Sequence, residues 1–399
     1  LLLESLKYNY YNNNIKMKIF IKIIIFFYII FVFNVSNIWA NEKIKIGLLV
    51  PITGKDSQIG KSIIKSTRLA INKIGNPLIE IIPKDTKSNP EMTLKKAKEL
   101  SDEEVKIVIG PVFNKNLVYL DELKNMIFLS LTNKIVNNPN NIISAGINST
   151  SQFNTISKFQ KMNELKKTII LIPKESYMEE IEEGIKQSKM MSQKVYYYDV
   201  EPTKLTKQIE KITKYRIRKN NLKYEIKRIE ESNVSNKEKK IENLKKKDTL
   251  GRLNFDSVII SDFDESLKSI ITSLLYTDVS PKNVYFLTLN QWFDETLLKE
   301  ENLQPIFFPS INKENYDLFL ENYYKKFNEY PNQLSFLSYD LVGLVYYLIV
   351  QNNFTIDKKM FLKESMFKGK IGIFEVKDNK INHILNLYKI ENNEFKKIF

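Results

Sequence analysis

The sequence contains no cysteine, and His383 is the only histidine among its 399 residues. Without cysteine the chain has no disulfide, no thiolate metal ligand, no cysteine nucleophile and no lipidated N-terminal cysteine. A single histidine without an acid and a nucleophile beside it is typical of a structural role. The motifs Gly-x-Ser-x-Gly, His-Glu-x-x-His and the calcium loop are absent as well. We therefore expect binding rather than catalysis, with no catalytic residue, no metal site and no cofactor.

Arginine is scarce, because only five of the 61 basic residues are Arg in a chain whose net charge is +14. Lys, Asn, Ile, Tyr and Phe dominate instead, as in the product of an AT-rich coding sequence. A general surplus of lysine is typical of a solvated surface, whereas selective phosphate recognition favours arginine forks and aromatic stacking. The composition therefore predicts no nucleic-acid partner.

Long apolar runs are also few, and the clearest lies near the start of the chain. Residues 17–40 show the three parts of a signal peptide, namely Lys18 and Lys22, an apolar centre at 23–33, and Ile38-Trp39-Ala40 before Asn41. The first sixteen residues look like upstream sequence, with Met17 as the start. The apolar centre is shorter than the roughly 18 residues that a spanning helix needs. We expect a cleavable signal, export to the periplasm and no membrane span after cleavage, with an uncleaved anchor as the alternative.

Four short apolar runs alternate with helical patterns in the first third of the chain. The runs are 45–50, 78–82, 106–109 and 126–129, and the helical patterns cover 63–74 and 92–100. This order predicts a parallel sheet with helices on both faces. In such a sheet ligands bind outside the carboxyl ends of the strands, so the loops after these runs are the candidate site.

The second half repeats the alternation, and the total length favours two lobes. Strands are expected at 168–172, 195–198, 257–260 and 284–287, and helices at 316–327 and 338–350. From residue 370 the pattern alternates like strands, with hairpins around Asp378-Asn379 and Asn392-Asn393.

Residues 204–250 differ from their surroundings, because they are dense in Lys and Glu and contain neither Pro nor Gly before Gly251. Apolar residues at helical spacing predict two long helices that form a hairpin projecting from the second lobe, with a turn near 232–236. The hairpin is either a solvated charged element or a docking arm for another protein.

A segment after the first strand imitates a phosphate loop. Residues 54–62 start at Gly54 and end with Gly60-Lys61-Ser62, but five residues separate the two glycines where the motif has four. The backbone amides are then not expected to cradle a phosphate. A nucleotide-using enzyme is therefore the third hypothesis.

Short motifs spread over residues 43–399 carry a family resemblance. They are 46–54, Asp85-Thr86, 109–113, 129–133, Tyr339-Asp340 and 367–372. In this order they resemble the type I periplasmic binding proteins of the leucine/isoleucine/valine class. The resemblance implies an α/β fold of two lobes, each a mainly parallel sheet flanked by helices, with the helical hairpin inserted in lobe 2. It places lobe 1 at 43–147 and 287–350, and lobe 2 at 148–286, completed by C-terminal strands at 351–399.

Within this class the chain looks most like the penicillin-binding protein activators of alphaproteobacteria. The motifs are 110–113, the charged insertion ending in 248–251, 276–279 and 290–294. The resemblance implies regulation of peptidoglycan synthesis through contact with a peptidoglycan synthase. The alternative is the substrate-binding protein of an ABC importer for branched-chain or related amino acids, with a permease as partner. The best-known activators are lipid-anchored, and this chain has no cysteine to acylate.

The resemblance and the strand-end loops together give a set of candidate cleft residues. They are Thr53, Phe113, Asn114, Ser130, Leu131, Thr132, Tyr177, Asp262, Asn290 and Trp292. For a small amino-acid-like ligand, the α-carboxylate would meet amides and hydroxyls near Phe113, Asn114 and 130–132. Asp262 would pair with the ammonium, and Tyr177 would cover the site. Phe113 and Leu131 are bulky, so a narrowed or empty cleft is also open.

Overall fold

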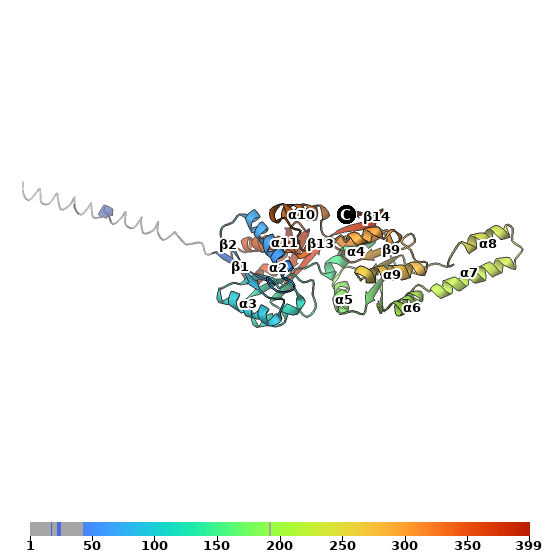
Figure 1. The fold of residues 1–399 in the computed structure, drawn as a ribbon, viewed down its shortest axis with the longest axis horizontal. Coiled ribbons are helices and arrows are strands. Elements are labelled where there is room, and N and C mark those ends of the chain that lie inside the picture. Colours follow the sequence, from blue (N-terminus) through green and yellow to red (C-terminus); the bar gives the residue numbers. More distant parts are fainter. Residues whose placement is uncertain (1–16, 18–21, 25–42, 191–192) are drawn as a thin grey trace, which may run out of the picture. The chain divides into compact units, whose positions relative to one another are not determined.

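The computed structural model describes residues 17, 22–24, 43–190 and 193–399 of the chain (Figure 1). The predicted signal segment, 17–40, lies outside the described residues except for Met17 and 22–24, which are helical. Residues 43–44 and 76–80 form a small unit of their own, in which the Ile44 amide donates to the Leu78 carbonyl over 2.7 Å. Apart from the first residues of two strands, 44 and 79–80, the two lobes described next lie in the large remaining unit.

The first lobe is built on a five-stranded sheet of order β2-β1-β3-β4-β5. Its strands are β1 (Ile44–Val50), β2 (Ile79–Asp85), β3 (Ile107–Ile109), β4 (Ile127–Ser130) and β5 (Ile142–Ser144). The pairs β1-β3, β3-β4 and β4-β5 are parallel. The flanking helices α2 (Ser57–Ile74) and α3 (Pro90–Asp102) cover the two predicted helical patterns. The prediction of an apolar parallel sheet with helices beside it is confirmed.

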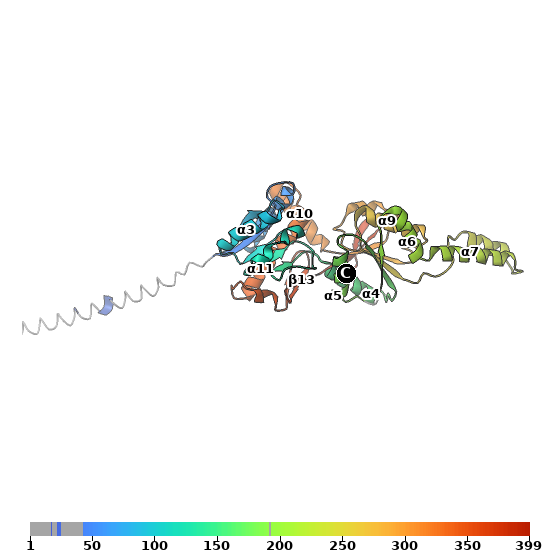
Figure 2. The ribbon, with the colours of Figure 1, turned by 90° about the horizontal axis from the view of Figure 1, so that it is seen from below.

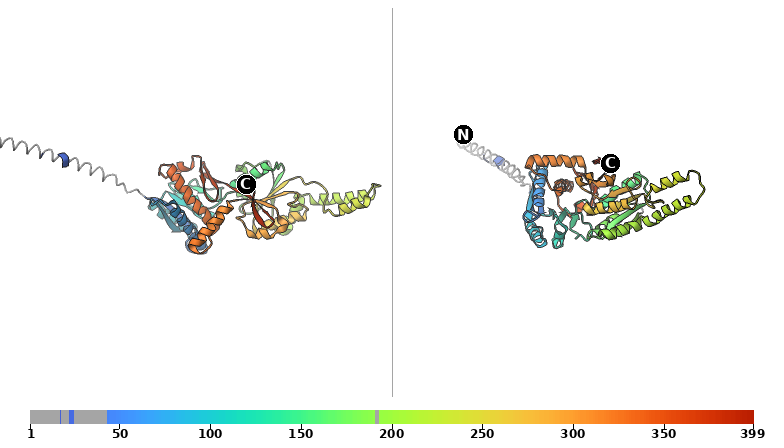
Figure 3. Two further views of the ribbon diagram at one scale, coloured as in Figure 1. Left: turned by 90° about the horizontal axis from the view of Figure 1, so that it is seen from above. Right: turned by 45° about the vertical axis from the view of Figure 1, so that its right-hand side comes forward.

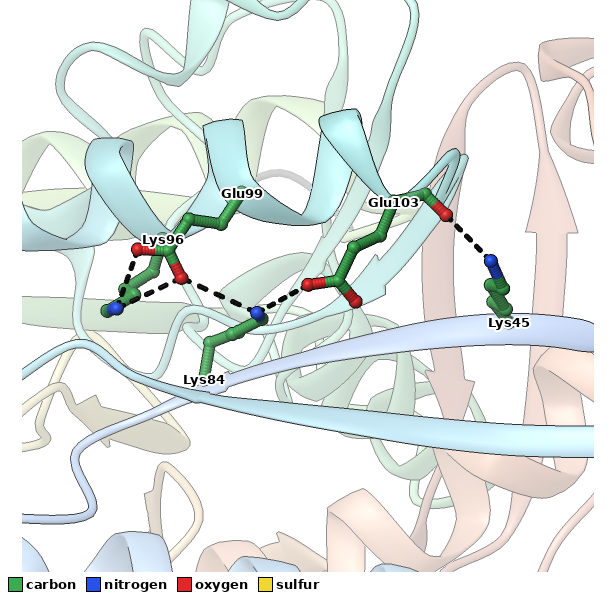
Figure 4. Close-up of polar contacts among 5 residues, drawn as sticks. All are labelled: Lys45, Lys84, Lys96, Glu99 and Glu103. Atoms are coloured by element: carbon green, nitrogen blue, oxygen red, sulfur yellow. Dashed lines mark hydrogen bonds and ion pairs between the residues drawn. The ribbon is translucent and has the colours of Figure 1, made fainter.

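Helix α3 is fixed to its sheet by packing and by charge. Ala97 and Leu100 pack against Leu49, Val108 and Phe128, all of which are buried. At the solvent edge of this contact, the Lys84 Nζ lies 3.4 Å from Glu99 and 2.6 Å from Glu103, as Figure 4 shows. The hydrogen bond to Glu103 raises the pKa of the Lys84 ammonium, so the ion pair favours the charged lysine.

The second lobe is built on a seven-stranded sheet of order β15-β14-β10-β9-β8-β6-β7. Its strands are β6 (Thr168–Pro173), β7 (Gln193–Tyr198), β8 (Ser257–Ile260), β9 (Tyr285–Thr288), β10 (Ile306–Ser310), β14 (Asn386–Glu391) and β15 (Glu394–Lys397). The strands from β6 to β10 pair in parallel, and β14 and β15 are antiparallel. Helices α4 (Ser149–Met162), α5 (Met178–Gln187) and α9 (Asp264–Tyr276) follow its strands or precede them.

A third, three-stranded sheet belongs with the first lobe. It consists of β11 (Ser365–Lys368), β12 (Ile373–Lys377) and β13 (Lys380–Ile384), and it packs on α11 (Gln333–Gln351). Phe367 meets Tyr347 of α11 at 5.7 Å between ring centroids. Helix α10 (Lys313–Phe327) also joins lobe 1, since Tyr323 donates to the Ser62 carbonyl of α2. In Figures 1 and 2, α10, α11 and β13 lie with α3, and α4, α5 and α9 lie together in the other body.

These pairings correct the predicted lobe boundaries at residues 287 and 351. Strand β10 belongs to lobe 2, because its buried Phe307 and Phe308 extend the lobe 2 core. Sheet β11-β12-β13 belongs to lobe 1, because Phe367 packs on Tyr347 of α11 and the Ile371 amide donates to Asp340 of α11. The chain therefore crosses between the lobes at 145–148, 311–312 and 385, and β14 and β15 alone complete lobe 2 from the C-terminal tail.

The charged insertion folds into three helices rather than two long ones. They are α6 (Pro202–Ile212), α7 (Tyr215–Glu230) and α8 (Lys237–Lys245). Helix α6 buries Leu205 and Ile209 in lobe 2, and Lys214, at φ 53°, breaks the chain before α7. The turn lies at 231–236, close to its predicted place. Figure 3 shows α7 and α8 as an antiparallel pair beyond α6 and α9.

Helix α11 is the one helix among the described residues that is long and apolar enough to cross a membrane. Its most apolar window is 61% buried inside the lobe, against α2 and the third sheet. Ser62 of α2 and Ser335 of α11 lie 2.6 Å apart between hydroxyl oxygens. Burial on most sides explains its composition as that of a core helix.

Candidate functional site

A pocket of about 700 Å³ lies between the two lobes. Loops at the carboxyl ends of β3, β4 and β9 supply most of its lining, as expected for parallel sheets. The start of α11 adds Gln333, Leu334 and Leu337, and the remaining lining comes from the segments after β5 and β8 and from α4, namely Gly146, Ile147, Phe263, Asp264 and Gln152. The volume lies in the range of small-molecule sites, so the cleft is not filled by its own side chains.

Six of the ten predicted cleft residues line this pocket, and four do not. Those in the lining are Phe113, Asn114, Leu131, Thr132, Asn290 and Trp292. Thr53 and Ser130 instead form hydrogen bonds with neighbouring loops. The Thr53 hydroxyl donates to Asp85 over 2.6 Å, and the Ser130 hydroxyl donates to the Pro111 carbonyl over 3.1 Å. Tyr177 and Asp262 line a separate, smaller pocket beside it.

The carboxylate of Asp262 is occupied by groups of its own lobe. It accepts hydrogen bonds from the Tyr198 hydroxyl at 2.6 Å, the Tyr177 hydroxyl at 3.1 Å and the Phe263 amide at 2.9 Å. Asp262 is 3% exposed. Burial, followed by the charge of Asp262, raises the pKa of both tyrosines, so they stay neutral donors. Three donors satisfy the carboxylate without an ammonium ion.

Three buried amides of the pocket wall are also bonded internally: the predicted Asn290, and Gln152 and Gln291, which the sequence did not single out. Gln152 accepts from the Asn290 amide over 2.7 Å and donates to the carbonyls of 147 and 148. The Asn290 side chain accepts from the Trp292 amide and the Ser310 hydroxyl. Gln291 donates to the Asp262 carbonyl. No motif in the sequence signals the contacts of Asn290 with Gln152 and Ser310 or of Gln291 with Asp262, because these join segments that are far apart in the chain.

The charge of the pocket is opposite in sign to that of the whole chain. Among the described residues that line it, Asp264 and Asp294 are acidic and none is Lys or Arg. Asp294 caps the short helix η3 (Glu295–Lys299), where it accepts from the Thr296 amide over 2.9 Å. Asp264 is exposed at the start of α9. The lining therefore favours a neutral or cationic ligand over an anion.

The loop after β9 holds Trp292 in a strained conformation. Trp292 and Phe293 have φ of 50° and 60°, in the left-handed region that side chains avoid. Such a conformation costs roughly 1 kcal/mol or more per residue, so the surrounding structure must impose it. Phe293 supplies that constraint, since its ring lies 4.9 Å from Tyr388, 5.5 Å from Phe395 and 5.9 Å from Phe308. The half-buried indole of Trp292 is thereby presented to the pocket.

His383 makes a polar contact within lobe 1, and Glu180 makes one between the lobes. His383 of β13 donates through Nε2 to the Ala145 carbonyl at 2.9 Å, which fixes its tautomer. Burial lowers the pKa of this imidazole to about 4. Glu180 of α5 accepts from the amides of Ile135 and Val136 in lobe 1, the first at 2.7 Å. The lone histidine thus has a structural contact, as its isolation in the sequence predicts.

The segment that imitates a phosphate loop has a packing explanation. Gly60 lies inside α2, where a Cβ atom would come within 1.8 Å of the Pro51 carbonyl oxygen. The glycine is needed because the first turn of α2 touches the loop that follows β1. Lys61 is exposed on the same turn.

Comparisons with known proteins agree with this architecture. Residues 43–189 match the family model described as periplasmic binding protein. No curated protein matches the chain by sequence. The structural likenesses are broader than the sequence match, because they cover about nine-tenths of the chain.

Three solved structures illustrate these likenesses. The C-domain of LpoA from Haemophilus influenzae, a regulator of PBP1A, has a TM-score of 0.58 at 14% identity and covers 89% of this chain and 100% of its own. Full-length LpoA from the same organism gives 0.61 at 15% identity, and the match spans 90% of this chain but only 59% of LpoA. A putative branched-chain amino acid ABC transporter protein from Rhodospirillum rubrum gives 0.64 at 10% identity and covers 89% and 100%.

At identities this low, the likeness concerns the fold. The chain therefore has the two-lobed α/β fold of the type I periplasmic binding proteins, similar both to the LpoA C-domain and to branched-chain amino acid binding proteins.

Proposed function

We propose that this protein is a non-catalytic regulator of peptidoglycan synthesis that acts in the bacterial envelope by contact with a peptidoglycan synthase. Three features support the proposal: the likeness to the LpoA C-domain, the inserted basic hairpin, and the way the inter-lobe pocket is built. The predicted signal at 17–40 agrees with an envelope location.

The main observation in favour of the proposal is that the carboxylate of Asp262 is already hydrogen-bonded within its own lobe. An amino-acid importer needs a carboxylate for the ligand ammonium and donors for its carboxylate. Here the candidate carboxylate accepts from Tyr177, Tyr198 and Phe263. In addition, no basic side chain lines the described part of the pocket. The carboxylate predicted for the ammonium is thus engaged within its own lobe, and the described lining has no basic residue for the ligand carboxylate, which favours a role through protein contact.

The hairpin of α7 and α8 is the surface we assign to the synthase. Residues 215–247 hold twelve basic and five acidic residues, so they carry +7 of the net +14. Ile217 and Tyr224 of α7 are 59% and 72% exposed and stand two turns apart on one face. Exposed apolar side chains surrounded by charged side chains are typical of a protein interface, whereas a helix that only faces solvent is polar on its exposed side.

The base of the hairpin is held firmly to lobe 2. The Arg218 guanidinium donates to the Thr277 carbonyl, and the Thr249 hydroxyl donates to Asp278. Leu250 donates its amide to the Arg218 carbonyl over 3.0 Å. A surface on such a rigid base suits docking, because little conformational entropy is lost when a partner binds.

A binding experiment with matched charge changes tests this proposal. The triple variant Lys223→Glu, Lys239→Glu and Lys240→Glu changes the hairpin charge by six units at exposed lysines. We expect its affinity for the organism's bifunctional peptidoglycan synthase to fall at least tenfold in surface-plasmon measurements, because electrostatic attraction becomes repulsion. The control is Lys124→Glu, Lys325→Glu and Lys326→Glu, which makes the same change on lobe 1. Equal loss in both variants, or no binding by the wild type, would refute the proposal.

The alternative function, amino-acid capture for an ABC importer, is favoured by one observation, the open volume of about 700 Å³. Asp264 is then the carboxylate available to an ammonium, and amides near Thr132 would hold the ligand carboxylate. Trp292 is the only tryptophan outside the predicted signal, so a Trp39→Phe chain reports on the pocket by fluorescence. Saturable quenching by leucine, with a matching rise in melting temperature, would establish the importer role.

The same proposal includes the absence of catalysis. Nucleotide turnover was the one catalytic alternative that the sequence raised, through residues 54–62. We expect no ATP or GTP hydrolysis above background. Hydrolysis by the wild type that Lys61→Ala abolishes would overturn this part of the proposal.

A further inference from the structure

A second cavity, of about 660 Å³, lies within lobe 1 and away from the inter-lobe pocket. Its floor is the outer face of α11, where Tyr339, Gly343, Tyr346, Tyr347 and Val350 follow one another at helical spacing. These positions span 11 residues, or about 16 Å along the helix axis. We call this cavity the lobe 1 groove.

The outer face of α11 is less buried than the apolar sequence of this helix predicts. A helix that is apolar on all sides is normally covered on all sides. The outer face of α11 is only partly covered by α2 and by β11, and Val350 is 38% exposed. Phe367 of β11 closes one wall, and a Cβ atom on Gly343 would come within 3.0 Å of its ring. An uncovered stripe of this size is typical of a binding surface.

The rim of the groove is basic. Lys73, Lys368 and Lys370 line it, and no ion pair is recorded for any of them within the described residues. The single acidic residue in the lining is Asp340, which is 3% exposed and accepts from the Ile371 amide over 2.6 Å. Burial raises the pKa of Asp340 to about 6, although the amides of residues 370 and 371 and the charge of Lys370 act in the opposite direction, so this carboxylate offsets part of one rim charge and leaves Lys73 and Lys368. The groove therefore offers positive charge over an apolar floor.

The lysines are spread along the groove instead of converging at one end. The Lys370 ammonium lies 6.0 Å from the centre of the Tyr339 ring, at the start of the stripe. Lys73 lies in the last turn of α2, seven residues beyond Ser66, or about 10 Å further along that helix. Ser62 of α2 meets Ser335 of α11, so the later part of α2 lies beside the later part of the stripe. A ligand with a single anionic head group would be bound by cations that converge at one point, whereas these lysines are spread along the groove.

Strand β11 adds a backbone surface to the same wall. It is the terminal strand of its sheet and pairs only with β12 in the described chain. An unpaired strand edge is a template for an extended segment, since it presents free amide and carbonyl groups. Residues 367–370 at the end of this strand line the groove.

We propose that the lobe 1 groove binds an extended acidic segment of a partner protein, in which aromatic or aliphatic side chains rest on α11 while carboxylates meet Lys73, Lys368 and Lys370. The apolar stripe of α11 selects apolar side chains in the bound segment, and the separated lysines select the spacing of its acidic residues. The edge of β11 favours an extended backbone. This site is independent of the hairpin and of the inter-lobe pocket, so it goes beyond the proposed function.

The test uses the full chain and labelled seven-residue peptides in fluorescence anisotropy. The main probe alternates glutamate with phenylalanine and leucine, a second probe replaces each glutamate by lysine, and a third is heptaglutamate. We expect the main probe to bind at least tenfold more tightly than either of the others, because it satisfies both the floor and the rim. Equal binding of heptaglutamate, or no binding of the main probe, would overturn the proposal.

Matched variants locate the binding. Lys73→Glu with Lys368→Glu should weaken the main probe at least tenfold, and Val350→Glu should do so through the floor. The hairpin triple variant should leave it unchanged, and Trp292 fluorescence should not respond. Loss of binding in the hairpin variant would assign the peptide to the hairpin and refute the groove. Binding of dodecanoate or phosphatidylglycerol vesicles in place of the peptide would refute it as well. Circular dichroism of each variant checks that the fold is intact.

Discussion

The inter-lobe pocket and the lobe 1 groove have nearly equal volumes but opposite chemistry. The pocket is lined by amides, two acids and aromatic rings, with no basic residue among the described lining. The groove is lined by aromatic and aliphatic side chains with three lysines at its rim. The net charge of +14 is therefore a poor guide to either site, since each is defined by which side chains its own packing leaves free. A family likeness directs attention to the first, and nothing in it points to the second.

The largest expected effect concerns the wall of the inter-lobe pocket. Replacing Asp262 by Ala leaves two buried tyrosine hydroxyls and an amide without their acceptor, so we expect a loss of about 3 kcal/mol in unfolding free energy. Asp262→Asn keeps one acceptor oxygen and should lose about 1 kcal/mol. Denaturant titration measures both. A neutral Asp262→Ala variant would mean that the carboxylate is held for a ligand rather than for the fold.

The second expected effect is a pH dependence of stability that has opposite signs at the two sites. His383, behind the pocket, has a folded pKa lowered to about 4, so its stabilising contribution is lost as the pH falls from about 6.5 toward 4. Asp340, beneath the groove, has a folded pKa raised to about 6, so stability falls as the pH rises from about 3.8 toward 6. The two trends oppose each other in the native chain.

Single variants separate the two trends. Asp340→Asn should leave a stability that rises between pH 4 and 6, and His383→Gln should leave one that falls over the same interval. A change in pKa from about 3.8 to about 6, or from about 6.5 to about 4, corresponds to roughly 3 kcal/mol when the whole pH interval is crossed. Urea unfolding at several pH values gives the slopes. Identical slopes in both variants would contradict the assignment of these groups.

A third comparison pairs one aromatic residue from each site. Trp292→Gly removes a side chain from a left-handed position, so the strain that it relieves offsets the lost contacts, and we expect a stability change within about 1 kcal/mol. Tyr347→Ala removes the contact with Phe367 and should cost about 2 kcal/mol. Thermal unfolding compares them directly. A costly Trp292→Gly would show that the indole supports the fold and is not simply presented to the pocket.

The smallest effect serves as a reference away from both sites. Lys84→Met removes the ion pairs to Glu99 and Glu103 at the solvent edge of α3 (Figure 4). Because these groups are partly exposed, we expect a loss of about 0.5 to 1 kcal/mol that shrinks in high salt. Chemical denaturation in low and high salt measures it. A salt-independent loss would assign the effect to the packing of the lysine stem.

Much of the fold follows from local pattern. The predicted strands became β1 to β4 and β6 to β9, and the tail hairpins turn where Asp378-Asn379 and Asn392-Asn393 adopt positive φ. Asn and Asp tolerate that conformation, so the residue types at these positions predict the turns. The lobe to which β10 and the third sheet belong was predicted wrongly, because an apolar run does not say which sheet it joins.

The candidate site divides in the same way. Phe113, Asn114, Leu131, Thr132, Asn290 and Trp292 reach the pocket because they follow strands, and strand ends meet in a parallel sheet. Asp262 also follows a strand, yet Tyr177 and Tyr198 take up its carboxylate. Hydrogen bonds between residues 64 and 85 positions apart leave no trace in a local pattern.

The classes of element, their order and the loops at the strand ends can be read from the amino-acid pattern, because hydrophobic period and turn chemistry act over a few residues. Three outcomes appear only in the folded chain: which sheet each late strand joins, which carboxylates and amides are already hydrogen-bonded, and which face of α11 stays uncovered. These outcomes depend on contacts between distant segments, since a buried polar group takes whichever partner the fold brings near it.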